Sequence, residues 1–220
     1  MISSNGAGEA ATAPTEPSAP IKIAVFASGN GSNFQALAES VRDGKINATL
    51  ELVVCDKPSA YVLERARSFQ VETYVFSPKE YPSREAYEAE IVAKLQAAGI
   101  DLIVMAGYMR LVTNVLVEPY YGRMINVHPA LLPAFTGIKG VEQALEYGAK
   151  ITGATVHFVD GGMDTGPIIA QKAVEIQDRD TLETLSARIQ QAEYDLLPTV
   201  VGWFADGRVA LNGRKVTINN

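Results

Sequence analysis

The sequence predicts an α/β protein: a single doubly wound, mostly parallel sheet with an antiparallel C-terminal portion. The first half of the chain alternates short apolar runs with segments of helical character, the order that produces a parallel sheet covered by helices on both faces. The second half opens with an alternating apolar and polar run, which is typical of antiparallel strands. A length of 220 residues suits one domain of this kind with a substantial core.

The parallel half begins with the apolar run Ile21–Ala27, which predicts a buried first strand followed by a tight turn. Strands and helices then follow in this order: helix Ser32 to about Arg42, strand Thr49–Cys55, helix Ala60–Ser68, strand Glu72–Val75, helix Ser83–Ala98, strand Asp101–Ala106 and strand Met124–Val127. Ser83 is a suitable cap for the clearest helix, whose inner face is marked by Tyr87, Ile91, Leu95 and Ala98. Ligands of open α/β sheets bind where such strands end.

Beyond Gly140 the pattern changes. Thr152–Val159 alternates, with one apolar face and one face that carries Thr155 and His157. The remaining elements expected are a turn at Asp160-Gly161-Gly162, an antiparallel partner strand Ile168–Val174, a long amphipathic helix Thr181–Val200, and a short terminal hairpin bounded by turns at Asp206-Gly207 and Asn212-Gly213.

Residues 1–20 are expected to be a disordered tail, and residues 21–220 a folded domain. The tail is rich in Ala, Ser, Thr, Pro and Gly, so it cannot bury enough apolar surface to offset its ordering entropy. It contains no Lys or Arg and no apolar core segment, which excludes a secretory signal and an Arg-rich transit peptide.

Charge and cysteine content narrow the function classes. With 19 basic and 25 acidic residues, the chain is not expected to bind nucleic acid or an anionic membrane surface non-specifically. No apolar run approaches the length of a membrane span. Cys55 is the only cysteine, which rules out an internal disulfide and indicates a reducing, cytoplasmic location.

The strongest chemical signal is the group Asn126, His128 and Asp164. Asn126 and His128 lie two residues apart on an extended segment, so their side chains face the same way. Asp164 lies on the glycine-rich loop Asp160–Pro167, from which its carboxylate could orient or charge the imidazole. An oxyanion donor, a proton carrier and a charge partner are the equipment for acyl transfer through a tetrahedral intermediate.

The same region allows two further interpretations. His157 lies in mid-strand, which favours a supporting or structural role over a catalytic one. A metal site formed by the two histidines with Asp160 and Asp164 is disfavoured, because no ligand spacing of the usual zinc kind is present. We therefore predict no metal.

The loop Gly29-Asn30-Gly31-Ser32-Asn33 follows the first strand and opens a helix, where free amides favour an anion. Phe34 occupies the third glycine position of the dinucleotide fingerprint, and no Gly-Lys-Ser/Thr of a P-loop follows. A simple phosphate monoester is the predicted ligand, and a plain tight turn is the alternative. Arg84 and Arg110 are further candidate anion holders, although Arg84 could equally be a solvated charge near a helix start.

Four motifs in this order resemble those of the phosphoribosylglycinamide formyltransferase family of purine biosynthesis: Gly29 through Asn33, Met105 through Arg110, Asn126-Val127-His128-Pro129 with Leu131-Leu132-Pro133, and His157 through Pro167. The resemblance covers about Ile21 to Arg208, and the last two motifs are highly specific in combination. It implies a Rossmann-like formyltransferase catalytic domain over residues 21–220. It also implies transfer of a formyl group from 10-formyltetrahydrofolate, a co-substrate, to the amine of glycinamide ribonucleotide.

The same resemblance assigns the site residues. Asn126, His128 and Asp164 would carry the catalysis. The ribonucleotide would be bound by Gly31, Ser32, Asn33, Gln190, Gln191 and Glu193. The folate would be bound by Arg84, Met109, Arg110, Leu111, Val112, Asn126, Asp160, Gly161, Gly162, Met163 and Asp164. The partners are thus small molecules, with no nucleic acid and no membrane, and the sequence leaves open a homodimer.

One departure and three alternatives accompany this assignment. In Ala134-Phe135-Thr136-Gly137, relatives often have a basic residue first and Pro in place of Thr136, so the rim of the site is expected to differ in shape. Methionyl-tRNA formyltransferase and formyltetrahydrofolate deformylase use the same Asn–His–Asp group, but each carries an additional domain that this length does not accommodate. A catalytically dead folate- or nucleotide-binding module is disfavoured because all three residues are present.

Overall fold

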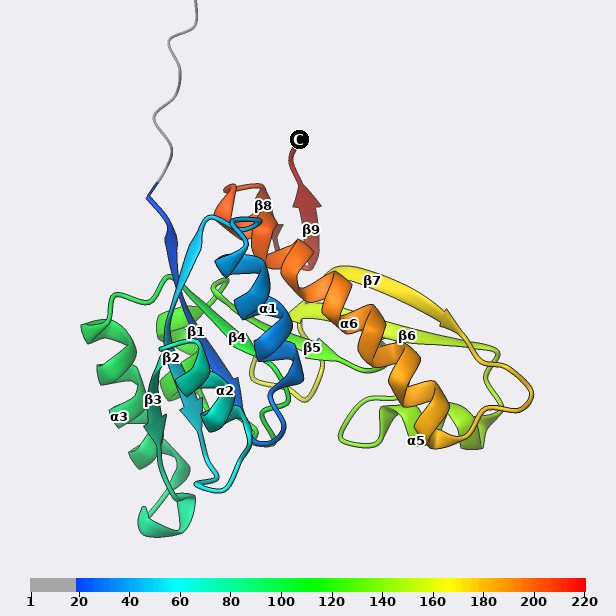
Figure 1. Ribbon diagram of the computed structural model, residues 1–220, viewed down its shortest axis with the longest axis horizontal. Helices are drawn as coiled ribbons and strands as arrows, with labels where there is room; N and C mark the ends of the chain where they lie inside the picture. Colours follow the sequence, from blue (N-terminus) through cyan, green and yellow to red (C-terminus); the bar gives the residue numbers. More distant parts are fainter. Residues whose placement is uncertain (1–18) are drawn as a thin grey trace, which may run out of the picture.

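The computed structural model describes residues 19–220, so most of the expected N-terminal tail lies outside the described residues. Seven strands form one sheet in the order β3-β2-β1-β4-β5-β6-β7 (Figure 1). They are β1 Ile21–Ala27, β2 Ala48–Cys55, β3 Glu72–Val75, β4 Leu102–Met105, β5 Met124–His128, β6 Ile151–Phe158 and β7 Ile168–Glu175. A separate antiparallel hairpin of β8 Val209–Asn212 and β9 Lys215–Ile218 follows.

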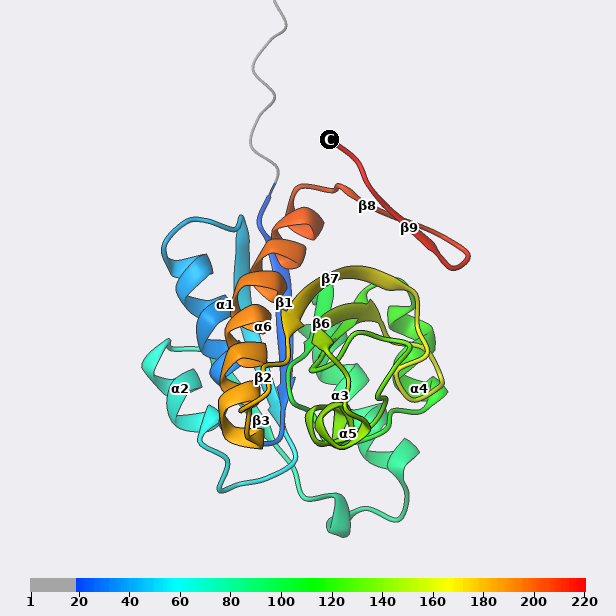
Figure 2. The same ribbon diagram turned by 90° about the vertical axis from the view of Figure 1, so that its right-hand side faces the viewer.

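Helices cover both faces of the sheet (Figure 2). They are α1 Ser32–Arg42, α2 Val62–Ser68, α3 Arg84–Ala97, α4 Asn114–Val117, α5 Gly140–Tyr147 and α6 Leu182–Ala205, with 3-10 turns at Pro78–Glu80 and Glu118–Tyr120. Buried residues of α1, α2 and α6 pack with one face of the sheet, and those of α3 and α4 pack with the other. The predicted doubly wound architecture is therefore confirmed.

The central strand β1 shows why its sequence is continuously apolar. Its alternate residues Ile23 and Val25 belong to one core cluster, while Ala24 and Phe26 belong to the other. All four are buried because both faces of the strand are covered by helices. An alternating sequence would have left a polar face against one of these layers.

The topology places a crevice beside β1. Strands β1 to β5 pair in parallel, but the order reverses between β1 and β4, which lie next to each other. The connections that follow these two strands therefore run to opposite faces of the sheet, and the gap between them is where such folds bind ligands. β6 and β7 extend the sheet as antiparallel strands, as predicted for the C-terminal portion.

Apart from shifts of one or two residues at the ends of elements, three helices differ from the prediction. The last helix continues to Ala205 rather than ending at Val200, because Val200, Val201 and Ala205 are all buried against the core despite Pro198 and Gly202 nearby. The helices α4 and α5 were not predicted. In the described residues 19–220, no helix has the length and apolar character required to cross a membrane.

Candidate active site

A cavity of about 680 Å³ lies at the carboxyl ends of β1, β4 and β5, at the reversal of strand order. Its wall is formed by the loop Gly29–Asn33, the segment Met105–Val112, the end of β5 from Asn126 to Pro129, the loop Asp160–Asp164, and residues of one face of α6. Segments that are far apart in the sequence thus meet at one edge of the sheet.

Nearly every residue that the sequence pointed to lines this cavity, including Asn126, His128 and Asp164. Gln191 does not: its side chain points away and its amide donates to the Asp195 carboxylate, with 3.4 Å between Nε2 and Oδ1. A helix turns by about 100° per residue, so Gln190 and Glu193 share a face that Gln191 cannot. The predicted contact between Gln191 and the ribonucleotide therefore finds no support in the residues of the cavity wall.

His128 ends β5 and is buried, with both ring nitrogens engaged. Its Nε2 lies 2.8 Å from the Phe135 carbonyl oxygen, and its Nδ1 lies 3.5 Å from Asp164 Oδ2. A carbonyl oxygen only accepts hydrogen bonds, so Nε2 carries a hydrogen in the neutral and the charged ring alike. The nitrogen that gains or loses a proton is therefore Nδ1, which faces the carboxylate.

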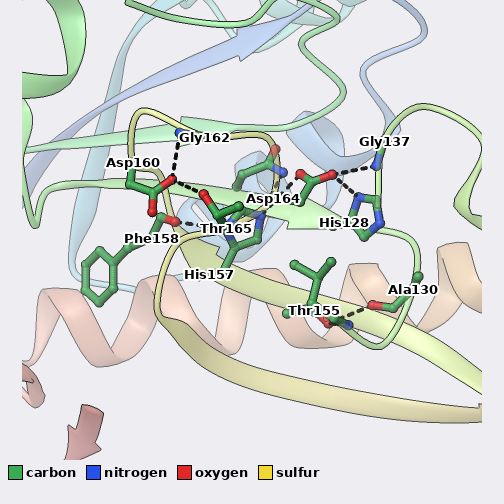
Figure 3. Close-up of polar contacts among 12 residues, drawn as sticks. His128, Ala130, Gly137, Thr155, His157, Phe158, Asp160, Gly162, Asp164 and Thr165 are labelled. Carbon is green, nitrogen blue, oxygen red and sulfur yellow. Dashed lines mark hydrogen bonds and ion pairs between the residues drawn. The ribbon is translucent and has the colours of Figure 1, made fainter. Parts of the chain in front are cut away.

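Asp164 lies at the centre of the polar group in Figure 3. Its Oδ2 accepts a hydrogen bond of 2.7 Å from the Gly137 amide and faces His128, while its Oδ1 lies 3.7 Å from His157 Nε2. Its backbone has a φ of 55°, in the left-handed region that a non-glycine residue rarely adopts. The loop therefore holds this carboxylate between two imidazoles at some cost in backbone strain.

His157 supports Asn126. Burial lowers the pKa of His157, which makes the neutral ring the dominant form at neutral pH. Its Nδ1 donates to the Phe158 carbonyl oxygen at 2.8 Å, so its Nε2 is an acceptor, and Asn126 Nδ2 lies 3.2 Å from it. This contact fixes which end of the Asn126 amide carries the hydrogens. The supporting role expected of His157 agrees with this geometry.

The loop Ala134–Gly137, whose sequence predicted an altered rim, contributes through its backbone. The Phe135 carbonyl accepts from His128, the Gly137 amide donates to Asp164, and the Thr136 carbonyl accepts from Gln143. A Cβ at Gly140, the first residue of α5, would lie 2.9 Å from the Phe135 oxygen, so the loop and the helix fit closely only with glycine there. These contacts were missed because backbone groups leave no signature in side-chain identity.

The Asp160 carboxylate shapes the next loop. Its Oδ1 accepts from the Gly162 amide at 3.0 Å and from the Thr165 hydroxyl at 2.6 Å. Asp160 therefore closes a turn, as the simpler interpretation of Asp160-Gly161-Gly162 required, and it also lines the cavity. The turn presents Gly161, Gly162 and Met163 to the cavity wall.

The glycine loop forms the opposite end of the cavity. Gly31 precedes α1 with a φ of 75° and no side chain caps the helix, whose first turn contains no acidic residue. The first amides of a helix have no partner within it, so this end of α1 is suited to an anion. Asn33, in the first turn, donates to Glu193 Oε2 at 2.8 Å, and burial raises the pKa of Glu193 to about 7.

The two candidate anion-holding arginines differ in their surroundings. Both line the cavity, and Arg84 is the first residue of α3. The Arg110 Nε donates to the buried Asp56 carboxylate at 2.7 Å, a bond that raises the pKa of Arg110. Ser28, the residue after β1, accepts a hydrogen bond from the Met109 amide at 2.9 Å and so ties the segment that carries Arg110 to the glycine loop.

No group of three or more His, Cys, Asp or Glu side chains suited to holding a metal ion occurs within residues 19–220. The polar group at the end of β5 consists of an amide, two imidazoles and one carboxylate. Such a set can stabilise a negatively charged oxygen and move a proton, which is the chemistry of acyl transfer between a carbonyl and an amine.

Comparison with known proteins identifies the class. The sequence pattern of the formyl transferase family matches residues 21–201, and the chain belongs to that family. The match spans all the elements that build the cavity, from β1 through most of α6.

Particular relatives narrow the class further. The phosphoribosylglycinamide formyltransferase of Bacillus subtilis is 51% identical over 180 residues, covering 82% of this chain and 92% of that protein. The Escherichia coli phosphoribosylglycinamide formyltransferase is 38% identical over 192 residues, which cover 87% of this chain and 91% of that protein. The crystal structure of glycinamide ribonucleotide transformylase 1 from Symbiobacterium toebii superposes with a TM-score of 0.90 at 44% sequence identity. The superposition covers 92% of this chain and 96% of that one.

Proposed function

We propose that this protein transfers the formyl group of 10-formyltetrahydrofolate to the amine of glycinamide ribonucleotide. The products are formylglycinamide ribonucleotide and tetrahydrofolate, and the reaction is a step of de novo purine biosynthesis. Family membership and the high identity to phosphoribosylglycinamide formyltransferases support the reaction. The roles of individual residues are inferred from the cavity.

One observation carries the assignment of roles: a single cavity has an anion-binding loop at one end and the Asn126, His128 and Asp164 group at the other. The phosphate of the ribonucleotide fits the amides of Gly31, Ser32 and Asn33. Its ribose and glycinamide portion would then lie along Gln190 and Glu193 of α6, and its amine would reach the β5 end. In this arrangement the Asn–His–Asp group would lie beside the reacting carbon.

The folate would bind along a different part of the cavity wall. Met109, Leu111, Ile138 and Met163 line the cavity, yet their side chains are substantially exposed. An apolar rim of this kind suits a flat heteroaromatic ring, which removes the side chains from water on binding. The remaining wall of this subsite is formed by Arg110, Val112, Asp160, Gly161 and Gly162, and Arg84 is suited to a carboxylate of the folate tail.

The first chemical step is attack of the amine on the formyl carbon, which places negative charge on the formyl oxygen. Asn126 has a second amide hydrogen besides the one directed at His157, and a hydrogen on His128 Nδ1 would be shared between Asp164, 3.5 Å away, and the formyl oxygen. Donation from both to the developing oxyanion lowers the barrier, because these donors are fixed before reaction. Asp164 Oδ2 lies 3.5 Å from His128 Nδ1 and so orients the imidazole toward the reacting carbon in this proposal.

The second step breaks the bond between the formyl carbon and the folate nitrogen. The attacking nitrogen loses a proton, and the departing folate nitrogen gains one, so the transfer is balanced without a covalent enzyme intermediate. Asp164 and a water molecule that it holds would relay this proton. Cys55, the last residue of β2, is buried and takes no part in this scheme.

A tetrahydrofolate-release assay tests the function. We expect release from 10-formyltetrahydrofolate only when glycinamide ribonucleotide is present. Release without the ribonucleotide would instead identify a deformylase, and binding of both ligands without turnover would identify an inactive module. A cytoplasmic location belongs to the same proposal and is supported by the single free cysteine. Sedimentation of the purified protein decides between a monomer and the homodimer that the sequence leaves open.

A further inference from the structure

Arg65, in helix α2, reaches across to the glycine loop. Its Nε donates to the Asn30 carbonyl oxygen at 2.9 Å, and its Nη2 donates to Asn30 Oδ1 at 2.7 Å. One loop residue therefore receives both bonds, through its backbone and through its side chain. The guanidinium carbon also lies 4.9 Å from the centre of the Tyr61 ring, one helical turn earlier, which restricts the arginine to this orientation.

The same helix contacts the residues on either side of Asn30. The Val62 amide donates to the Gly29 carbonyl oxygen at 3.1 Å. The Val62 side chain lies so close to Gly31 that a Cβ there would be 2.5 Å from Val62 Cγ2. Helix α2 thus holds three consecutive residues of the loop, immediately before the free amides of α1.

A second arginine on α2 provides a contrast. Arg67 lies two residues further along and is exposed, and its Nη1 donates to the exposed Glu64 carboxylate at 2.6 Å. Such surface pairs contribute little to stability. Arg65 and Arg67 carry the same charge and lie on the same helix, but only Arg65 reaches the glycine loop. Asn30 lines the cavity, whereas Arg65 is not among the residues of its wall.

We propose that Arg65 is a positioning residue for the phosphate end of the ribonucleotide. It acts through Asn30, holding the loop so that the amides of Gly31, Ser32 and Asn33 converge before the ligand arrives. A loop already in its bound conformation loses less entropy on binding, so affinity rises without a new contact. The inference rests on the proposed function, because the phosphate in question is that of the proposed substrate.

The test compares three variants. Arg65→Gln removes the charge and the two-point contact, Arg65→Lys keeps the charge but cannot form the same planar pair of bonds, and Arg67→Gln is the matched control. We expect Arg65→Gln to raise the KM for the ribonucleotide by about 10- to 100-fold, the range for loss of a charged hydrogen bond. The KM for the folate and the kcat at saturation should stay within about twofold, as should every constant of Arg67→Gln.

The lysine variant separates positioning from charge. If the contact with Asn30 is what matters, Arg65→Lys should recover little of the lost affinity. Full recovery with lysine would overturn the positioning role and leave only a long-range charge effect. Equal loss of folate affinity, or a fall in kcat, would also overturn it, because a loop-specific effect cannot produce either.

A second pair of measurements keeps the inference testable if the glutamine variant folds poorly or if the proposed substrate is wrong. Asn30→Ala removes the side-chain acceptor on the loop side, and combining it with Arg65→Gln should cost less than the sum of the single effects. Binding of inorganic phosphate, followed by the NMR shifts of the Ser32 and Asn33 amides, should weaken in Arg65→Gln and Asn30→Ala alike. Failure of ribonucleotide turnover in the wild type, with this phosphate result intact, would reject the substrate and retain the inference. Unchanged phosphate affinity in both variants would reject the inference itself.

Discussion

The two ends of the cavity are built from different kinds of group. At the β1 end, the loop Gly29–Asn33 offers backbone amides, and its shape is set by a left-handed glycine and by contacts from α2. At the β5 end, Asn126, His128 and Asp164 offer side chains that hold one another and are held by the backbone of Phe135 and Gly137.

This difference indicates how each end responds to change. Backbone amides have no protonation state to lose near neutral pH, so the β1 end depends on conformation. The β5 end depends on which atoms carry hydrogens, because a donor that is removed or turned leaves the oxyanion without a partner. We therefore expect substitutions at the β5 end to lower kcat and substitutions at the β1 end to raise the ribonucleotide KM.

The largest effect is expected for His128→Ala. Loss of a positioned proton carrier lowers kcat by about 10²–10⁴, and binding of both substrates should change far less. Steady-state kinetics measures the split, and a thermal melt checks that the variant is folded, since the Phe135 carbonyl loses its donor. Near-normal turnover of a folded variant would remove His128 from the mechanism.

Asn126→Ala should follow, with a loss of about 10²–10³ in kcat, the usual consequence of deleting one oxyanion donor. Ribonucleotide and folate binding should be less affected, because the amide acts mainly on the charge that develops during reaction. An unchanged kcat with a raised KM would show that Asn126 is a binding residue, and the contrast between the two ends of the cavity would then be weaker than proposed.

Gly31→Val tests the other end. A side chain there meets Val62 at 2.5 Å and must adopt a φ of 75°, so the loop should open and ribonucleotide affinity should fall by about 10- to 100-fold. Folate affinity, measured separately by calorimetry, should stay close to the wild type. Gly148→Val is the matched control, because Gly148 has a φ of 74° with open space around it and does not line the cavity. Equal loss of both affinities in Gly31→Val would indicate general misfolding.

Much of the fold was predictable from local pattern. The bounds of β1, α1 and β3 were predicted as observed, and Ser83 caps α3 through a bond of 3.2 Å from the Ala86 amide to its Oγ. The end of α6 was not predicted correctly, because Pro198 and Gly202 locally disfavour a helix. The helix continues beyond them because Val200 and Val201 are buried in the core. The helices α4 and α5 are too short to show a clear period, and α5 begins at a glycine.

The site was predictable where side chains carry the chemistry. Asn126, His128 and Asp164 were placed together by spacing and by the end of a strand, and the structure brings them into contact with the same cavity. The backbone of Phe135 and Gly137 was not predictable, since neither residue type indicates a carbonyl or an amide directed at the site. The role of Arg65 was equally hidden, because only the packing of α2 distinguishes it from Arg67.

The smallest effect is expected for Glu193→Gln, and it should appear as pH dependence. Burial raises the pKa of this carboxyl group to about 7, although the bond from Asn33 acts in the opposite direction. Ribose hydroxyls would donate to its ionised form, so ribonucleotide binding should improve as pH rises through this value. Between pH 6 and pH 8 the ionised fraction rises about tenfold, and the KM for the ribonucleotide should fall by up to that factor, with little change in the folate KM.

The phosphate of the substrate also titrates near pH 6, and its second ionisation strengthens binding in the same direction. The variant Glu193→Gln separates the ionisation of Glu193 from that of the phosphate. Glutamine cannot ionise, so the pH dependence of the KM that remains in the variant belongs to the phosphate.

The pH dependence of folding stability tests the raised pKa independently. The folded chain retains a proton that the unfolded chain releases near the ordinary glutamate value, so the wild type should lose stability as pH rises from there to about 7, and the variant should lose less. If the KM of the variant falls as steeply with pH as that of the wild type, Glu193 does not exchange a proton on binding, and the pH dependence of the ribonucleotide KM belongs to the phosphate of the substrate.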